Sequence, residues 1–356
     1  MSFITLGIES SANKIGVGIA KRDNSTFVEL ANVRETFTTL PGEGLIPKNI
    51  AEHHRSVVND LVLLALKTAG LTSSEIDYIA YTKGPGMAPC LLVGALVART
   101  LSLLWNVPLV PVNHCVAHIE MGRAVCNSVN PVILYASGGN SQIIGFYNNR
   151  YRIYGETIDI AVGNALDRFA RFIKLPNNPA GGFWIEKLAK YGKKYIELPY
   201  VIKGMDVSFS GLISFIENYA KKNKIEYKGP CLPSELIGDW FTVDMQNVAD
   251  LCYSLQETAF AMMIETTERV MALTQATEIL CVGGVGCNLR LQEMLTLMAE
   301  DRNAKLNAMD DRYCVDNGLM IAWNGILHIE QNEYGQWDEC TVSQRYRTDT
   351  VNINWR

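Results

Sequence analysis

One pattern occurs twice in this chain and limits its fold more than any other feature. Residues 4–20, "ITLGIESSANKIGVGIA", and residues 132–147, "VILYASGGNSQIIGFY", each combine an apolar strand, a turn of small polar residues and a second strand. Patterns typical of helices follow both openings, among them residues 47–69 after the first and 248–273 after the second. Mixed strands and helices around two similar openings predict an α/β protein with two lobes related by duplication, and a ligand site between them.

The two openings also set the expected lobe boundaries. We predict an N-terminal lobe at residues 1–125 and a C-terminal lobe at residues 126–340, followed by a tail at 341–356. A helical insertion at about 164–245 interrupts the second lobe, and its polar part, 225–245, is expected to be a surface loop. A chain of 356 residues is too long for one compact core, which agrees with two lobes.

Charge is distributed unevenly. Residues 164–228 contain 12 Lys and Arg against 6 Asp and Glu, a local charge of +6, so the rest of the chain carries −5 − 6 = −11. This asymmetry indicates either a surface that faces a polyanion or ordinary amphipathic helices with solvated lysines.

Cysteines and hydropathy indicate the compartment. The nine cysteines have no regular spacing, which is typical of reduced thiols in the cytoplasm or nucleus. The most apolar window, "APCLLVGALVARTLSLLW", is interrupted by Arg99. We therefore expect a buried helix there and no membrane span.

Three turns are rich in glycine and small polar residues: "ESSANKIG", "SGGNS" and "GGVGCN". Such turns let backbone N–H groups approach a phosphate, although each one alone is equally typical of a tight hairpin. "GGVGCN" is not a dinucleotide fingerprint, because Leu289 stands where that motif needs glycine or alanine. Three such turns in this order resemble the nucleotide-binding turns of the fold shared by actin, heat-shock chaperone ATPases and sugar kinases.

Two histidines in "VNHCVAHIEMG" lie four residues apart. His114 and His118 share a helix face, so they either hold a metal ion or form a packed core pair. The segment lacks the glutamate of the HExxH protease signature, and a divalent ion needs further donors. Tyr135 and Asp316 are the candidates, although Tyr135 is also a plausible strand aromatic and Asp316 a plausible helix cap.

Several motifs together resemble one family over residues 3–356. They include "ANKIGVGI", "GEGLIPKNIAEHHR", "AYTKGPGM", "VNHCVAHIEMGR", "YASGGNSQ", "GETIDIAVGNALDRFAR", "KGMDVSFSG", "VGGVGCNLRLQEM" and "QRYRTD". The chain resembles the tRNA threonylcarbamoyladenosine transferases, and within them the archaeal and eukaryotic catalytic subunit of the KEOPS (EKC) complex. The resemblance implies the two-lobed actin-like ATPase (ASKHA) fold with duplicated mixed sheets. The sequence departs from the family pattern at 180–184, "AGGFW", and at 87–90, "MAPC".

The resemblance also implies an activity and a set of site residues. The activity is transfer of a threonylcarbamoyl group from threonylcarbamoyl-AMP to the exocyclic amine of the adenosine 3′ of the anticodon, in tRNAs reading codons that begin with A. One divalent ion, of zinc, iron or magnesium, would be held by His114, His118, Tyr135 and Asp316. The nucleotide would contact Tyr135, Ala136, Ser137, Gly138 and Gly139, the ribose would contact Asp167, Gly182 and Glu186, and the adenine would contact Asn288. Glu9 and Lys83 are candidate catalytic residues without an assigned role.

The implied partners are tRNA and the other KEOPS subunits: a small protein kinase, a kinase-binding subunit and a small dimerising subunit. An apolar helix face at Val57, Leu61, Leu64 and Ala65 is a candidate surface for the dimerising subunit, or part of the core. Three other functions stay open: an actin-like ATPase or small-molecule kinase, a metallopeptidase, and a catalytically silent scaffold.

Overall fold

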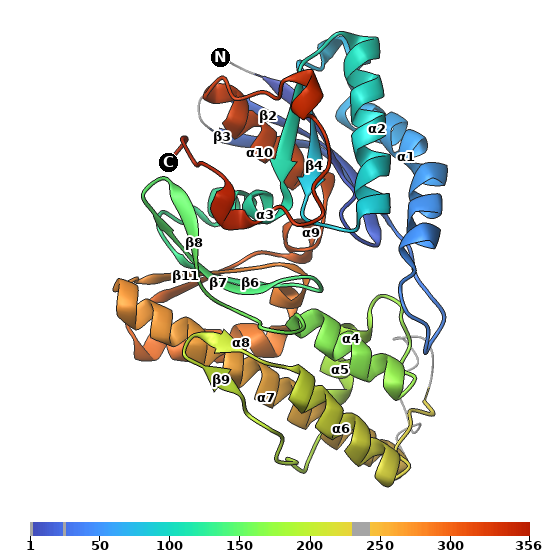
Figure 1. Ribbon diagram of the computed structural model, residues 1–356, viewed down its shortest axis with the longest axis vertical. Helices are drawn as coiled ribbons and strands as arrows, with labels where there is room; N and C mark the ends of the chain where they lie inside the picture. Colours follow the sequence, from blue (N-terminus) through green and yellow to red (C-terminus); the bar gives the residue numbers. More distant parts are fainter. Residues whose placement is uncertain (1–2, 24–25, 230–242) are drawn as a thin grey trace.

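The computed structural model describes residues 3–23, 26–229 and 243–356, and its elements are arranged in alternating layers of helices and sheets (Figure 1). The first sheet has the strand order β3-β2-β1-β4-β5. Its strands are β1 (Ile4–Glu9), β2 (Lys14–Asp23), β3 (Thr26–Thr36), β4 (Tyr78–Gly84) and β5 (Leu109–Asn113). β1, β2 and β3 are antiparallel neighbours, whereas β4 and β5 run parallel to β1.

The second sheet repeats this topology. Its strand order is β12-β11-β6-β7-β8, with β6, β7 and β8 antiparallel and β11 and β12 parallel to β6. Its strands are β6 (Val132–Ala136), β7 (Ser141–Tyr147), β8 (Arg150–Glu156), β11 (Glu278–Val282) and β12 (Lys305–Ala308). The duplicated α/β architecture predicted from the two strand–turn–strand openings is therefore confirmed.

Helices cover both sheets and fill the space between them (Figure 1). α1 (Pro47–Ala69) and α2 (Ala88–Trp105) pack on the outer face of the first sheet. α3 (His114–Cys126) and α10 (Gly318–Glu330) share a core with residues of both sheets. The outer face of the second sheet is covered by α4 (Val162–Phe172), α5 (Gly181–Ala189), α6 (Ser210–Lys222), α7 (Val243–Thr274) and α8 (Leu289–Asp301).

The described connecting segments contain several short elements. They contain the small ladder of β9 (Ile202–Lys203) and β10 (Asp206–Val207), the one-turn helix α9 (Asp311–Cys314), and the 3-10 turns η1 (Ser73–Glu75), η3 (Gly284–Cys287), η4 (Trp337–Glu339) and η5 (Thr348–Thr350). The surface loop expected at 225–245 lies mostly outside the described residues, which resume at α7.

Glycines bring α10 unusually close to the first sheet. A Cβ atom on Gly7 would lie 2.2 Å from the backbone nitrogen of Ala322, and one on Gly18 would lie 2.2 Å from that of Leu319. Gly318 is equally restricted, because its Cβ would lie 2.3 Å from the nitrogen of Gly18. α10 therefore packs against β1 and β2, although its sequence falls within the range predicted for the C-terminal lobe. The lobe boundaries themselves stay predictions.

The apolar helix α2 is buried on one face only. It is the single helix, within the described residues, that is long and apolar enough to cross a membrane. Its outer face exposes Leu92, Leu96, Leu103 and Leu104. The expectation of a buried helix is therefore wrong for this face.

The apolar face expected on α1 also needs correction. Leu61 and Ala65 are buried in the core between α1, α2 and the first sheet, so they are not available to a partner. The exposed aliphatic side chains of α1 are Leu63 and Leu64. They and the four exposed leucines of α2 form what we call the α1–α2 apolar surface.

Candidate functional site

α3 presents the two histidines on one face. The helix starts at His114 because the side chain of Asn113 caps it, accepting hydrogen bonds from the backbone N–H groups of Cys115 (2.9 Å) and Val116 (3.1 Å). The two imidazole rings have centroids 4.7 Å apart. A histidine pair four residues apart is thereby fixed at the end of β5, between the two sheets.

Asp316 completes a group that fits a metal ion. Its Oδ1 lies 3.1 Å from His118 Nε2 and 3.6 Å from His114 Nε2. One ligand atom from each of the three side chains lies within 4.8 Å of the others. Asp316 is not the cap of α10, because the neighbouring Asn317 caps that helix by accepting a bond from the N–H of Met320 at 2.9 Å. The carboxylate is thus directed to the histidines.

Tyr135 lies beside this group at the end of β6. Its ring centroid is 5.5 Å from that of His118, and the side chain is fully buried. Within the described chain its hydroxyl is a buried oxygen without a conventional hydrogen-bond partner. Burial raises the pKa of the phenol well above its ordinary value, so a cation is needed to make it a phenolate. Two imidazoles, a carboxylate and an orphaned phenol form a donor set that fits a divalent metal.

Glu9 orients His114 from behind. It is fully buried, and its carboxylate accepts bonds from Ser11 N–H (2.6 Å), Thr82 Oγ1 (2.6 Å) and His114 Nδ1 (3.0 Å). Burial alone would raise the pKa of Glu9, but the interactions with His114 lower it overall. In His114 burial alone would lower the pKa, yet the Glu9 carboxylate raises it to about 9. A carboxylate behind a ligating imidazole fixes its tautomer and ring orientation.

Lys83 is engaged elsewhere. Its Nζ donates to the carbonyl oxygen of Glu339 at 3.1 Å and lies 5.8 Å from the ring centroid of Tyr346. It holds the C-terminal tail against β4.

Lys14, which the sequence interpretation did not select, lies at the metal group instead. Its Nζ is 3.9 Å from Asp316 Oδ2, the oxygen turned away from His118. The signal that identifies it is a cation placed directly after the turn of "ESSANKIG".

The second and third glycine turns are in contact. Ser137 closes the second turn, because its Oγ accepts a bond from the N–H of Asn140 at 3.0 Å. In the third turn, Gly283 has φ +90°, and a Cβ there would lie 2.5 Å from the carbonyl oxygen of Ala136. In contrast, a Cβ on Gly138, Gly139 or Gly284 would meet no atom within 4 Å, so the outer sides of both turns are open. Such open backbone is suited to a phosphate.

The predicted ribose and adenine residues all take part in hydrogen bonds within the protein. Asp167 in α4 accepts a bond from the N–H of Gly182 at 3.1 Å, and burial raises its pKa. Glu186 in α5 accepts one from the N–H of Leu289 at 3.3 Å. The side chain of Asn288 caps α8 and donates to Gln256 Oε1 at 3.0 Å, so much of its bonding capacity is occupied. Their nucleotide contacts stay predictions.

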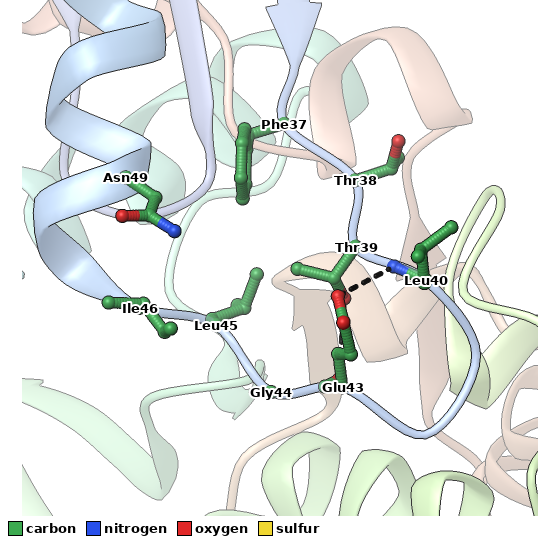
Figure 2. Close-up of a pocket in the computed structure, with 9 residues that line it drawn as sticks. All are labelled: Phe37, Thr38, Thr39, Leu40, Glu43, Gly44, Leu45, Ile46 and Asn49. Carbon is green, nitrogen blue, oxygen red and sulfur yellow. Dashed lines mark hydrogen bonds between the residues drawn. The ribbon is translucent and has the colours of Figure 1, made fainter.

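Residues 37–46 form a strap between β3 and α1 (Figure 2). Most of the strap, together with Asn49 of α1, lines a pocket of about 590 Å³. Phe37 and Asn13 exchange two hydrogen bonds, of 2.8 and 3.1 Å, which tie the strap to the β1–β2 turn. Asn177, between α4 and α5, donates to the carbonyl oxygen of Leu40 (2.7 Å) and to Thr39 Oγ1 (2.9 Å).

Comparisons with known proteins show the family to which the chain belongs. A model of the family described as tRNA N6-adenosine threonylcarbamoyltransferase matches residues 26–323. The chain is 58% identical to a probable tRNA N6-adenosine threonylcarbamoyltransferase of Drosophila melanogaster, over 99% of this chain and 98% of that protein. It is 55% identical to the enzyme of Encephalitozoon cuniculi (99% of each chain) and 53% identical to the human enzyme (99% and 98%).

Solved structures support the fold alone. HypF of T. kodakarensis aligns with a TM-score of 0.59 at 13% identity, covering 93% of this chain and 48% of that one. The activator of the 2-hydroxyisocaproyl-CoA dehydratase of Clostridium difficile aligns with a TM-score of 0.53 at 11% identity, covering 93% and 97%. These neighbours have the actin-like ATPase fold, as predicted.

Proposed function

Because the chain belongs to the tRNA N6-adenosine threonylcarbamoyltransferase family, whose activity it shares, we propose a specific donor and a specific target for this enzyme. The donor is threonylcarbamoyl-AMP, and the target is the adenosine 3′ of the anticodon in tRNAs reading codons that begin with A. The observation that carries the proposal is the group of His114, His118 and Asp316 next to open glycine turns.

The chemistry of the acceptor requires an activated donor. The exocyclic amine of adenine is a poor nucleophile, so the carbonyl that it attacks needs a good leaving group. A mixed anhydride with AMP has one, and an enzyme then contributes chiefly by positioning the reactants and stabilising charge. The open sides of the turns at Gly138, Gly139 and Gly284 suit the AMP phosphate.

One divalent ion would be held by His114, His118, Tyr135 and Asp316. Bound there, it would neutralise phosphate charge or polarise the carbonyl of the donor. Imidazole ligands suit zinc and iron, whereas carboxylate and water suit magnesium, so metal analysis of the purified protein is needed to identify it.

The proposed nucleotide contacts define an orientation for the nucleotide. With Asp167, Gly182 and Glu186 at the ribose and Asn288 at the adenine, the acyl phosphate points toward the metal group. Threonylcarbamoyl-AMP is expected to bind more tightly than AMP, because its threonyl carboxylate and hydroxyl add polar contacts.

Calorimetry with both nucleotides tests this orientation. Asp167→Ala should weaken AMP and threonylcarbamoyl-AMP by a similar factor, on the order of 1–3 kcal/mol, because hydrogen-bond partners are left unsatisfied. Glu197→Ala, which changes an exposed carboxylate outside the site, is the matched control. A variant that loses threonylcarbamoyl-AMP binding but keeps AMP binding would place Asp167 at the acyl end instead.

Neither a kinase nor a peptidase is favoured by the site. A kinase needs a carboxylate base that faces a hydroxyl, but Glu9 and Asp316 are both engaged by the imidazoles. In the segment between the two histidines no glutamate supplies the base of a zinc peptidase.

The proposed assembly is the KEOPS complex, with a small protein kinase, a kinase-binding subunit and a small dimerising subunit. The exposed leucines of the α1–α2 apolar surface support a protein partner there, since several large apolar side chains exposed on neighbouring helices are typical of an interaction site. The cationic segment 164–228 supports a contribution to tRNA binding, which should be salt-dependent. We also propose that the protein works in the cytoplasm and nucleus, since every described cysteine is a free thiol.

A further inference from the structure

Lys14 is a cation placed between the two halves of the site. It is the first residue of β2, directly after the first turn, and its side chain is 26% exposed. Its ammonium group approaches Asp316, on the metal side. The charge of Lys14 also acts on Asp167, on the ribose side. Burial raises the pKa of the Asp167 carboxyl, while the hydrogen bond from Gly182 and the charges of Arg171 and Lys14 lower it. The ammonium therefore lies within electrostatic reach of both the metal group and α4.

The contacts of Lys14 leave it free to bind a ligand. Its distance to Asp316 Oδ2 is 3.9 Å and that to Asn13 Oδ1 is 3.4 Å, both longer than a strong charge-assisted hydrogen bond. An ammonium group has three N–H donors. Lys14 thus keeps donor capacity for a ligand beside the metal group, unlike Lys83, whose amine bonds the carbonyl oxygen of Glu339.

Charge develops at the donor phosphate during the reaction. The lone pair of the adenine N6 attacks the carbamoyl carbon, and a new C–N bond forms. The bond between that carbon and the phosphate oxygen breaks, its electron pair leaves with AMP, and one N6 proton passes to solvent. The phosphate carries one negative charge in the mixed anhydride and up to two in AMP, so a fixed cation there stabilises the transition state more than the bound donor.

We propose that Lys14 binds the donor phosphate and stabilises the departing AMP. This inference rests on the adenylate donor of the proposed function. It assigns Lys14 a substrate contact rather than a metal contact, since lysine ammonium groups do not ligate metals and Asp316 turns its other oxygen to the histidines.

Calorimetry of the metal-loaded enzyme with AMP and with adenosine tests the contact directly. Lys14→Met should lower the affinity for AMP about tenfold or more, because a hydrogen bond to a charged group is lost. Adenosine, which has no phosphate, should bind within about twofold of wild type. Lys14→Arg should retain most of the AMP affinity. Lys21→Met, on the same strand, is the matched control and should change neither ligand.

Kinetics and metal content separate this role from a structural one. Lys14→Met should lower kcat by roughly 10- to 100-fold and keep the metal content of wild type. Loss of the metal, or equal weakening of AMP and adenosine, would show that Lys14 only supports Asp316 and would overturn the proposal. If the wild-type enzyme does not use threonylcarbamoyl-AMP while Lys14→Met still weakens AMP selectively, the proposed donor is wrong but the phosphate contact holds.

Discussion

At the scale of single residues, the site depends on which neighbour each buried charge meets. Asp316 would have a raised pKa from burial alone, but the hydrogen bond with His118 and the charges of Lys14 and His114 lower it far below its usual range. It therefore stays an anion in the protein interior. A buried anion that is shared by two imidazoles is a ready ligand for a cation.

Removing one imidazole should remove the metal. Replacing a residue that only orients a metal ligand commonly lowers metal affinity by about 10–100-fold. Loss of a ligand itself should cost more, so His114→Ala and His118→Ala should each lower metal affinity by more than about 100-fold. Both variants should lose tRNA modification and stay folded. Metal analysis by mass spectrometry is the measurement. His53→Ala is the control, because His53 contacts Phe37 and His54 instead of the metal group. Full metal occupancy in the double variant would contradict the assignment.

Metal binding should also depend on pH through His114. Its pKa in the metal-free protein is raised to about 9 by Glu9, against the opposing effect of burial. The imidazolium contributes stability that is fully present below its unfolded pKa and is lost as pH rises through about 9. A metal must displace this proton, so apparent affinity should rise about tenfold per pH unit between pH 7 and 9.

Competition with a chelator at several pH values measures this dependence. Glu9→Gln removes the carboxylate that raises the pKa of His114, so its affinity should level off at lower pH. A flat profile in the wild-type protein would contradict the raised pKa.

At the scale of elements, the position of the site depends on how closely α10 packs on the first sheet. The strap at residues 37–46 adds a contact between the two lobes. Asp316 lies two residues before α10, which meets β1 and β2 through glycines, so the distance of α10 from the sheet also sets the position of the carboxylate. The strap at residues 37–46 is held at one end by the first turn and at its middle by Asn177.

A methyl group on Gly18 should destabilise the protein. Its Cβ would overlap the backbone of Leu319, which cannot move without shifting α10. Gly18→Ala should lower the free energy of unfolding by about 1–3 kcal/mol, or more, as expected for an overpacked core. Denaturant unfolding is the measurement. Gly211→Ala, in α6 with no atom within 4 Å of its Cβ, should not destabilise the protein.

Releasing the strap should change its dynamics without unfolding the lobes. Asn177→Ala removes the amide that bonds Thr39 and Leu40, so residues 37–46 should exchange their amide hydrogens faster. Hydrogen–deuterium exchange measures this effect. Asn223→Ala removes an amide that bonds only within the end of α6 and is the control. Unchanged exchange in the strap would show that Asn177 does not hold it.

At the scale of the whole molecule, we propose that the exposed leucines of α1 and α2 are a surface for a partner. α1 and α2 lie side by side (Figure 1). Each helix buries one face in the core of the first sheet and exposes leucines outside that core. These leucines give α2 its high hydropathy, and a soluble chain tolerates such a surface best when another protein covers it.

A charge on this surface should disrupt the assembly. Leu96→Glu combined with Leu103→Glu should abolish copurification of the dimerising subunit from the protein's own cells, because charges would be buried at the interface. The fold should be unaffected, since the two side chains are each 67% exposed. Leu273→Glu, at a side chain of α7 that is 61% exposed, is the control. Unchanged copurification with the double variant would place the partner elsewhere.

Features encoded over short distances were predictable from the sequence. The strand–turn–strand openings depend on alternation and turn residues, and the facing histidines depend on a spacing of four in one helix. Both features depend only on residues that are close together along the chain. The duplicated fold and the facing pair of histidines could therefore be predicted from the sequence. The site residues beyond them rested on resemblance to a family.

Only the tertiary structure decided how distant residues are used. Asp316 is about 200 positions from the histidines, and the adjacent Asn317, which caps α10, leaves it free to approach them. Lys14 and Lys83 are both lysines beside a glycine-containing turn, yet Lys14 meets the metal group whereas Lys83 bonds the carbonyl oxygen of Glu339. α2 has apolar residues on both its buried and its exposed side, so its sequence does not reveal which side faces solvent. The structure shows this, because the first sheet covers one side and leaves the other exposed. In each case a sequence pattern defines what a side chain is able to do, whereas the packing of distant segments selects the partner that it meets.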